Sequence, residues 1–113
     1  MMAKLYGVPT ISVDEVERKL GQPNVQIIDV NPQRAWAKGH VPKATNLDPA
    51  EYTEQDLPAD KDAILIFYCS GPLCGAAPHA AKRAKRMGYR QVFVMSEGIE
   101  GWMRQHKPVE QST

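Results

Sequence analysis

Both cysteines of the chain lie in one short stretch, "CSGPLCG", where Cys69 and Cys74 are five positions apart. A thiol has a reference pKa of roughly 8.5, and its thiolate form is the nucleophile. Cys69 follows an apolar run and precedes an alanine-rich segment, which places it where a strand hands over to a helix. The unpaired N–H groups and the dipole of a helix start favour negative charge, so the sequence predicts a reactive thiolate at Cys69.

The loop between strand and helix is predicted to cradle an anion. Gly71 is expected to adopt positive φ and to turn successive N–H groups inward. Such a loop suits a phosphate, a sulfur oxyanion or a persulfide carried on Cys69. The other interpretation is that Cys69 is a buried and inert cysteine. The predicted loop residues are Ser70, Gly71, Pro72, Leu73, Cys74 and Gly75.

Cys74 has two interpretations that the sequence leaves open. It is either a resolving or relay thiol that attacks or receives a sulfur bound to Cys69, or a small apolar residue that pins the loop. A zinc site from Cys69, Cys74 and His79, with His40 or His106 as fourth ligand, lacks the paired C-x2-C spacing of such sites. We therefore predict no metal.

The elements that must position these residues alternate between strands and helices. Short β-branched and apolar runs predict strands at Val25–Val30, Ala63–Tyr68 and Gln91–Met95, with a further short one within "ATNL". Segments with helical periodicity or helix-boundary residues lie between and around them. This alternation predicts an α/β fold with a mostly parallel sheet and helices on both faces. Binding sites in such sheets lie at the carboxyl ends of strands, where Cys69 and Asp29 are expected.

Composition sets the wider frame. The chain has 113 residues, 42% of them hydrophobic and 24% charged, with a formal net charge of +1. We predict one domain over residues 1–113, with a core at about 8–107 and short tails. No signal peptide or membrane-spanning run is visible, so a cytoplasmic location is expected, or a periplasmic one if a leader was removed. Neither nucleic acid nor membrane is expected as a partner.

Several other side chains have plain structural interpretations. The basic stretch "KRAKR" with Arg90 is expected to be a solvated helix face, and partner docking is the alternative. Trp36 and Trp102 are expected to pack in the core or at its rim. Asp29 is expected to bond neighbouring backbone rather than to act as an acid or base.

Two longer stretches carry a family resemblance. "IIDVNPQRAWAKGHVPKATNL" resembles the signature of rhodanese-like sulfurtransferases, in which Asp-Val closes a strand and Gly-His-Val-Pro follows a short helix. The second half is similar as well, with "FYC" at a strand end, an alanine-rich helix ending in Gly-Tyr, and "EGIEGW". The matched motifs run in the expected order from Ile27 to Trp102.

The resemblance implies a single rhodanese domain with a five-stranded, mostly parallel sheet flanked by helices on both faces. Cys69 would carry a sulfane sulfur as a persulfide and pass it to a thiol, cyanide or a protein acceptor, with no cofactor. Asp29 and His40 would support the site structurally. Small-molecule donors and thiol acceptors are the expected partners.

Two departures from the family pattern affect the donor. Rhodanese loops commonly carry an arginine near their end, whereas "CSGPLCGAAPHA" has no arginine or lysine before Lys82. The loop region is also about two residues longer and looks like a Cys-x-Gly/Asn-Pro-x-Cys subgroup. Thiosulfate is therefore not the expected physiological donor, because a dianion would lose its charge-assisted contact. The alternatives are a thiol–disulfide protein using the Cys69–Cys74 couple and a non-catalytic binding module with this fold.

Overall fold

One parallel sheet forms the centre of the protein. The computed structural model describes residues 7–112, and its four strands lie in the order β2-β1-β3-β4, all parallel. The strands are β1 (Val25–Asp29), β2 (Thr45–Asn46), β3 (Ile64–Tyr68) and β4 (Gln91–Val94). The helices are α2 (Val13–Lys19), α3 (Gln33–Lys38), the 3-10 turn η1 (Glu54–Asp56), α4 (Ala76–Arg86) and α5 (Gly98–Arg104).

Strand β3 is apolar throughout because it is covered on every side. It pairs with β1 and β4, and successive side chains point to opposite faces of the sheet. Leu65 and Phe67 belong to one hydrophobic cluster, and Ile66 and Tyr68 to the other, all with no exposed surface. The carboxyl end of β3 is therefore held rigidly at the middle of the sheet.

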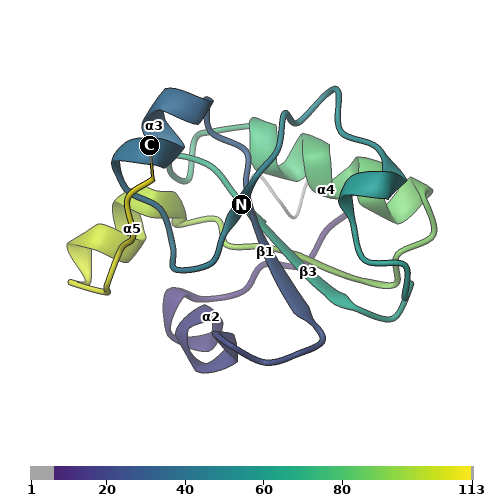
Figure 1. Ribbon diagram of the computed structural model, residues 1–113, viewed down its shortest axis with the longest axis horizontal. Helices are drawn as coiled ribbons and strands as arrows, with labels where there is room; N and C mark the ends of the chain where they lie inside the picture. The colour runs from purple at the N-terminus through teal and green to yellow at the C-terminus, as the bar shows by residue number, and fades with distance from the viewer. Residues whose placement is uncertain (1–6, 113) are drawn as a thin grey trace.

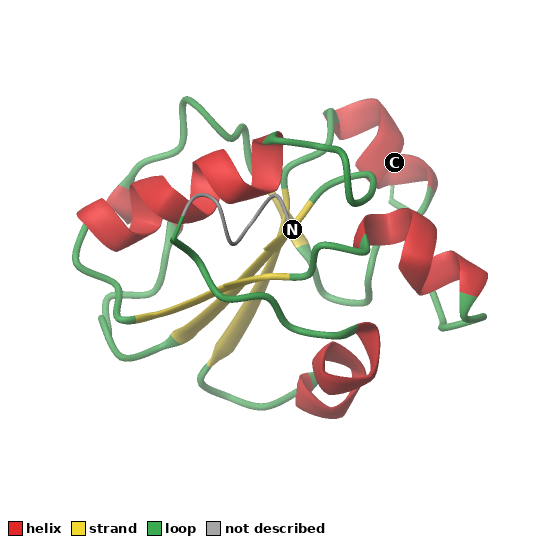
Figure 2. Ribbon diagram, turned by 180° about the vertical axis from the view of Figure 1, so that it is seen from behind, coloured by secondary structure: helices red, strands yellow, loops and turns green. Residues whose placement is uncertain are grey.

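Helices cover both faces of the sheet (Figures 1 and 2). Helix α4 packs on one face, and its small side chains allow it to lie close to the strands; Ala77, Ala80, Ala81 and Ala84 are all buried there. Helices α2 and α5 cover the other face, with Val13, Val16 and Trp102 in the second cluster. The α/β architecture expected from the sequence is confirmed.

The sheet has four strands within residues 7–112, one fewer than the five that the family resemblance implies. On the outer side of β4 the chain forms only an isolated parallel bridge between Thr10 and Val94. Ile11 N donates to Val94 O, and Val94 N donates to Pro9 O. Pro9 has no N–H to continue the ladder, which explains why pairing stops after one bridge. The three long strands begin or end within one residue of the predicted bounds.

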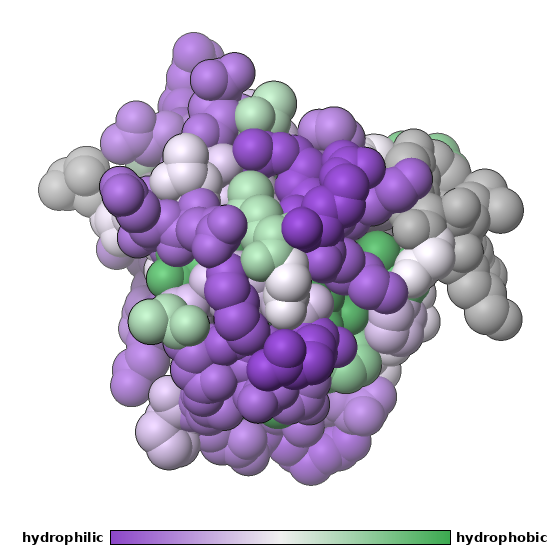
Figure 3. Space-filling view, turned by 90° about the vertical axis from the view of Figure 1, so that its right-hand side faces the viewer, coloured by the Kyte–Doolittle hydropathy of each residue, from purple (hydrophilic) through white to green (hydrophobic). Residues whose placement is uncertain are grey.

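The surface is mostly polar. Figure 3 views the right-hand side of Figure 1, and the hydrophobic side chains on this face form small separate patches. Of the basic stretch, Arg83 is engaged within the fold, since its guanidinium donates to Pro49 O and Tyr52 O and lies over the Tyr52 ring. Lys82, by contrast, is exposed. No helix within residues 7–112 has the length and apolar character needed to cross a membrane.

Candidate active site

Cys69 stands at the carboxyl end of the central strand. It follows β3 directly and is 3% exposed, and its side chain belongs to the cluster on the α4 face. The Cys69 carbonyl oxygen accepts a hydrogen bond from Ile99 N at 3.0 Å, and the Ser70 carbonyl oxygen accepts one from Glu100 N at 3.0 Å. The first turn of α5 thus holds the start of the loop by its two carbonyl groups.

The loop closes on itself through its two cysteines. Cys69 and Cys74 form a disulfide with Cα atoms 6.4 Å apart, within the range of about 4.4–6.8 Å that disulfides require. Cys74 N donates to Gly71 O at 3.1 Å, which makes Gly71–Cys74 a tight turn. Leu73 at the tip of this turn is 90% exposed.

Helix α4 presents its amino end immediately after the loop. Gly75 precedes the first helical residue, and no side chain of the described residues caps this end. The first amides of an α-helix have no partner within the helix. Pro78 has no N–H, so the amides of the first turn that can bind an anion are those of Gly75, Ala76 and Ala77.

Gly71 does not adopt the positive φ expected from the sequence. Its lack of a side chain matters for another reason: a Cβ at this position would lie 2.6 Å from Oε1 of Glu100. The glycine therefore makes room for a carboxylate of α5. An exposed negative side chain thus lies against the loop.

Gly98 is the glycine of this site that does require positive φ, at 65°. A Cβ there would lie 2.5 Å from the Ser70 carbonyl carbon and 2.6 Å from Gly71 N. Only glycine allows the amino end of α5 to approach the loop backbone this closely. No local pattern in the "EGIEGW" segment predicts this role, because the contact joins segments nearly thirty positions apart.

A small cavity is lined by both cysteines. Its volume is about 10 Å³, which is about the space one water molecule needs. Every residue that lines it is uncharged: Cys69, Gly71, Pro72, Cys74, Ala77, Pro78, Val94, Met95 and Ser96. With the disulfide closed, Cys69 has no thiolate, so a sulfur donor can react with it only in the reduced protein.

Asp29 lies on the opposite face of the sheet from the Cys69 side chain. It is fully buried, and its two carboxylate oxygens accept hydrogen bonds from Tyr68 OH at 2.7 Å and from Asn31 N at 2.8 Å. Burial raises the pKa of Asp29, and these hydrogen bonds oppose that effect. The Tyr68 hydroxyl also accepts from Val41 N at 3.0 Å, so one tyrosine links β1, β3 and the segment after α3.

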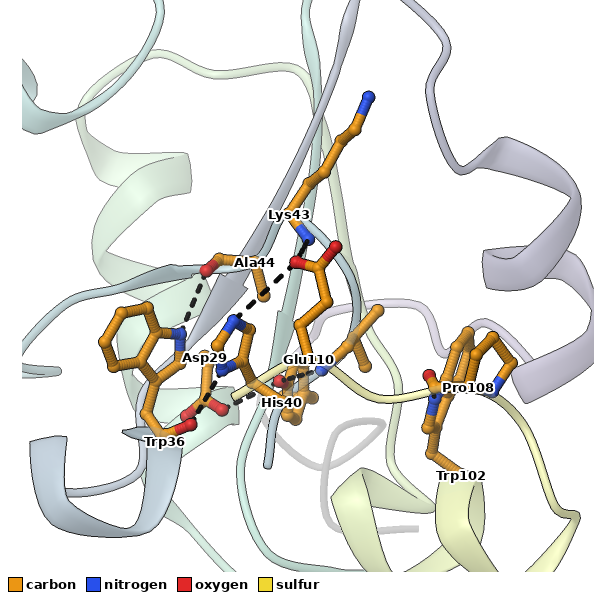
Figure 4. Close-up of polar contacts among 10 residues, drawn as sticks. Asp29, Trp36, His40, Lys43, Ala44, Trp102, Pro108 and Glu110 are labelled. Carbon is orange, nitrogen blue, oxygen red and sulfur yellow. Dashed lines mark hydrogen bonds and ion pairs between the residues drawn. The ribbon is translucent and has the colours of Figure 1, made fainter. Parts of the chain in front are cut away.

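His40 is held between α3 and the C-terminal segment. The ring is 3% exposed, Nδ1 lies 2.7 Å from Trp36 O, and Nε2 lies 3.9 Å from a Glu110 carboxylate oxygen. Figure 4 shows that Glu110 Oε1 also accepts from Lys43 N. His40 and Glu110 exchange both backbone hydrogen bonds as well. The sequence offered no signal for Glu110, which is seventy positions away.

The two tryptophans pack as structural residues. Trp102 is fully buried and its indole N–H donates to Pro108 O at 2.7 Å (Figure 4). Trp36 is partly buried, stacks on the His40 ring with centroids 4.4 Å apart, and donates to Ala44 O at 2.9 Å. Their polar N–H groups are thus satisfied within the fold.

The remaining histidines do not join this site. His79 is exposed on the first turns of α4, and His106 is exposed just beyond α5. Within residues 7–112, no three His, Cys, Asp or Glu side chains are grouped closely enough to hold a metal ion.

Comparison with known proteins identifies the family. The Rhodanese-like domain family matches residues 12–105, and the chain belongs to this family. The protein is 30% identical to the HTH-type transcriptional regulator Rv0324 of Mycobacterium tuberculosis over 96% of this chain and 49% of that protein. The chain thus spans about half the length of that regulator. It is 28% identical to the uncharacterized protein YibN of Escherichia coli, over 90% of this chain and 72% of YibN.

Relatives named as sulfurtransferases are also present. The thiosulfate sulfurtransferase GlpE of Coxiella burnetii is 25% identical over 74% of this chain and 76% of its own. Among solved structures, the BH2092 protein of Bacillus halodurans has a TM-score of 0.84 and 26% identity, covering 97% of this chain and 80% of that one. A thiosulfate sulfurtransferase from Pseudomonas aeruginosa shares the fold, with a TM-score of 0.80, at 23% identity over 93% of this chain and 20% of that one.

The contact between α5 and the loop predicts an unequal effect of two glycine substitutions. Gly98→Ala and Gly21→Ala both place alanine at positive φ, which costs about 1–2 kcal/mol, but a Cβ at Gly21 meets nothing within 4 Å. We expect Gly98→Ala to lower the free energy of unfolding by at least about 1 kcal/mol more than Gly21→Ala, because the loop backbone must shift. Urea unfolding measures this, and alkylation of reduced Cys69 should change rate only in Gly98→Ala. Equal losses would contradict the contact.

The buried hydroxyl of Tyr68 predicts a second difference. Tyr68→Phe leaves an Asp29 carboxylate oxygen and Val41 N without their partner, and we expect a loss of about 3 kcal/mol or more in unfolding free energy. Tyr52→Phe is the matched control, since its buried hydroxyl donates only to Ala80 O, and it should cost about 1 kcal/mol. Denaturant unfolding of the two variants compares these values, and similar losses would contradict a special role for Tyr68.

Proposed function

We propose that this protein is a sulfurtransferase that carries a sulfane sulfur as a persulfide on Cys69. The observation that carries the proposal is the position of Cys69, at the carboxyl end of the central strand and before the amino end of α4, in a rhodanese-like domain. Relatives named as sulfurtransferases support the same class of activity.

The reaction proceeds in two half-reactions on one sulfur atom. In the reduced protein, the Cys69 thiolate attacks the outer sulfur of a donor RS–S⁻; the new S–S bond forms on Cys69 and RS⁻ leaves. An acceptor thiolate or cyanide then attacks the outer sulfur of the Cys69 persulfide and releases the Cys69 thiolate. Negative charge stays near the loop in both steps, and the amino end of α4 stabilises it.

The charges around the loop favour some donors over others. The cavity lining carries no charge, and the Glu100 carboxylate lies against Gly71. Thiosulfate is a small dianion, so the Glu100 carboxylate raises the free energy of its approach. A low-molecular-weight persulfide such as cysteine persulfide carries less net charge and is the preferred class of donor. The word thiosulfate in the name of the GlpE relative describes the donor of that protein and not of this one.

The non-catalytic alternative is a binding module that keeps the rhodanese fold. In such a module Cys69 would only fill space in the core, and any small apolar residue could replace it. What supports catalysis instead is the combination of Cys69, an uncapped helix end and a cavity that touches its side chain.

Substitution of Cys69 tests the proposal directly. Cys69→Ser replaces a thiolate by a hydroxyl that is a far poorer nucleophile. We expect formation of thiocyanate from cysteine persulfide and cyanide to fall to the uncatalysed background. Cys69 is 3% exposed, and a buried hydroxyl without a partner costs about 1–3 kcal/mol. Cys69→Ser should therefore unfold in a cooperative transition at a lower urea concentration than the reduced wild type, which shows that the variant is folded. Full activity in the serine variant would refute the assignment.

Substitution of Glu100 tests the donor class. We expect wild-type kcat/KM to be lower for thiosulfate than for cysteine persulfide. At low salt, Glu100→Gln should raise kcat/KM for thiosulfate roughly twofold to fivefold and kcat/KM for cysteine persulfide by less. At high salt, where the charges are screened, the substitution should change neither value.

A matched control removes the same charge elsewhere. Glu15→Gln changes an exposed carboxylate on α2, which lies on the face of the sheet opposite α4. Its kinetics should equal those of the wild type. A thiosulfate kcat/KM at or above the persulfide value in the wild type would overturn the donor assignment.

A further inference from the structure

The two cysteines of the loop differ in their access to solvent. Cys69 is buried at the end of β3, whereas Cys74 is partly buried and lies next to the exposed tip residue Leu73. They are nonetheless close enough to form a disulfide, with Cα atoms 6.4 Å apart. The bond joins an inner sulfur to an outer one within a single loop.

We propose that Cys74 resolves the Cys69 persulfide and releases its sulfane sulfur as sulfide, which makes the protein a thiol-dependent persulfide reductase. This inference rests on the proposed function, because it requires that the persulfide form on Cys69. It adds a product, hydrogen sulfide, and a role for a residue that simple sulfur transfer does not use.

The resolving step is a thiol–disulfide exchange within the loop. The Cys74 thiolate attacks the inner sulfur of Cys69–S–SH, and a bond forms between the two Sγ atoms. The bond between Cys69 Sγ and the sulfane sulfur breaks, and that sulfur leaves as HS⁻ with the electron pair and the proton it carried. The sulfane sulfur is reduced by two electrons and the two cysteines are oxidised to the disulfide that the structure contains.

The difference in exposure determines which sulfur of the disulfide an external thiol attacks when it reduces the protein. An external thiolate reaches the outer sulfur of Cys74, forms a mixed disulfide there and expels Cys69 as a thiolate at the amino end of α4. A second thiolate then attacks the external sulfur and frees Cys74. The balanced sum is RSSH + 2 R′SH → RSH + H₂S + R′SSR′, where R′SH is any low-molecular-weight or protein thiol.

The disulfide imposes an order on this cycle. In the disulfide state Cys69 has no thiolate to attack a donor. A second donor therefore cannot load sulfur until a thiol has reduced the bond. Persulfide loading and thiol reduction must alternate.

The test follows one round of the reaction without added thiol. Reduced wild-type protein, freed of reductant, is mixed with one equivalent of cysteine persulfide and followed by intact-mass spectrometry and a sulfide assay. We expect the wild-type mass to fall by two hydrogen atoms, because the disulfide forms. Free sulfide should appear at one equivalent per chain, in addition to the cysteine released from the donor. Cys74→Ala should instead retain one extra sulfur atom, with a persulfide lifetime at least about tenfold longer, because the neighbouring nucleophile is gone.

Control variants separate the possible failures. Cys74→Ser repeats the measurement in case alanine disturbs the loop, and Cys69→Ala, which keeps Cys74, should neither gain sulfur nor form the disulfide. Equal persulfide lifetimes and equal sulfide release in wild type and both Cys74 variants would overturn the resolving role while leaving the proposed function intact. No gain of sulfur in either Cys74 variant would overturn the proposed function itself, and this inference with it.

A second measurement tests the direction of reduction. Oxidised wild-type protein is treated briefly with a thiol, quenched with acid and mapped by peptide mass spectrometry. The mixed disulfide is expected on Cys74, with Cys69 free. A mixed disulfide mainly on Cys69 would contradict the assignment of the inner and outer sulfurs.

Discussion

The site depends on the contact between the amino end of α5 and the first two carbonyl groups of the loop. Ile99 N and Glu100 N hold the carbonyl oxygens of Cys69 and Ser70, and Gly98 makes the close approach possible. Because these oxygens are bonded to α5, the start of the loop is fixed against that helix. Cys69 and Ala77 of α4 line the same cavity, so the amino end of α4 lies near the Cys69 side chain. One helix thus positions the loop, and the other brings its positive dipole end close to it.

The sequence was sufficient to locate Cys69 and the sheet around it. An apolar run without polar alternation implied a strand covered on both faces, and β3 is such a strand. The apolar run ends directly before Cys69, which correctly placed this residue at the junction of strand and helix. These features depend on neighbouring residues and are therefore readable from a single chain.

What the sequence did not reveal depends on contacts between distant segments. Gly71 was expected to provide positive φ, but it makes room for Glu100, a residue in another element. The hydroxyl of Tyr68 satisfies groups of Asp29 and Val41 that no periodicity links to it. The expected number of strands was likewise too high by one, because Pro9 limits the pairing beside β4 to one bridge. In each case a tertiary neighbour decided the role of a residue whose local propensity was uninformative.

The disulfide spans only five positions along the chain, and this brevity has a thermodynamic consequence. A crosslink stabilises a protein mainly by restricting the unfolded chain, and in the chain-entropy treatment a loop this short gains only about 2 kcal/mol. Opening the bond therefore withdraws a small part of the free energy of folding, and β3 and α4 keep their apolar contacts with the rest of the core. The loop can change its covalent state repeatedly while the domain around it stays folded.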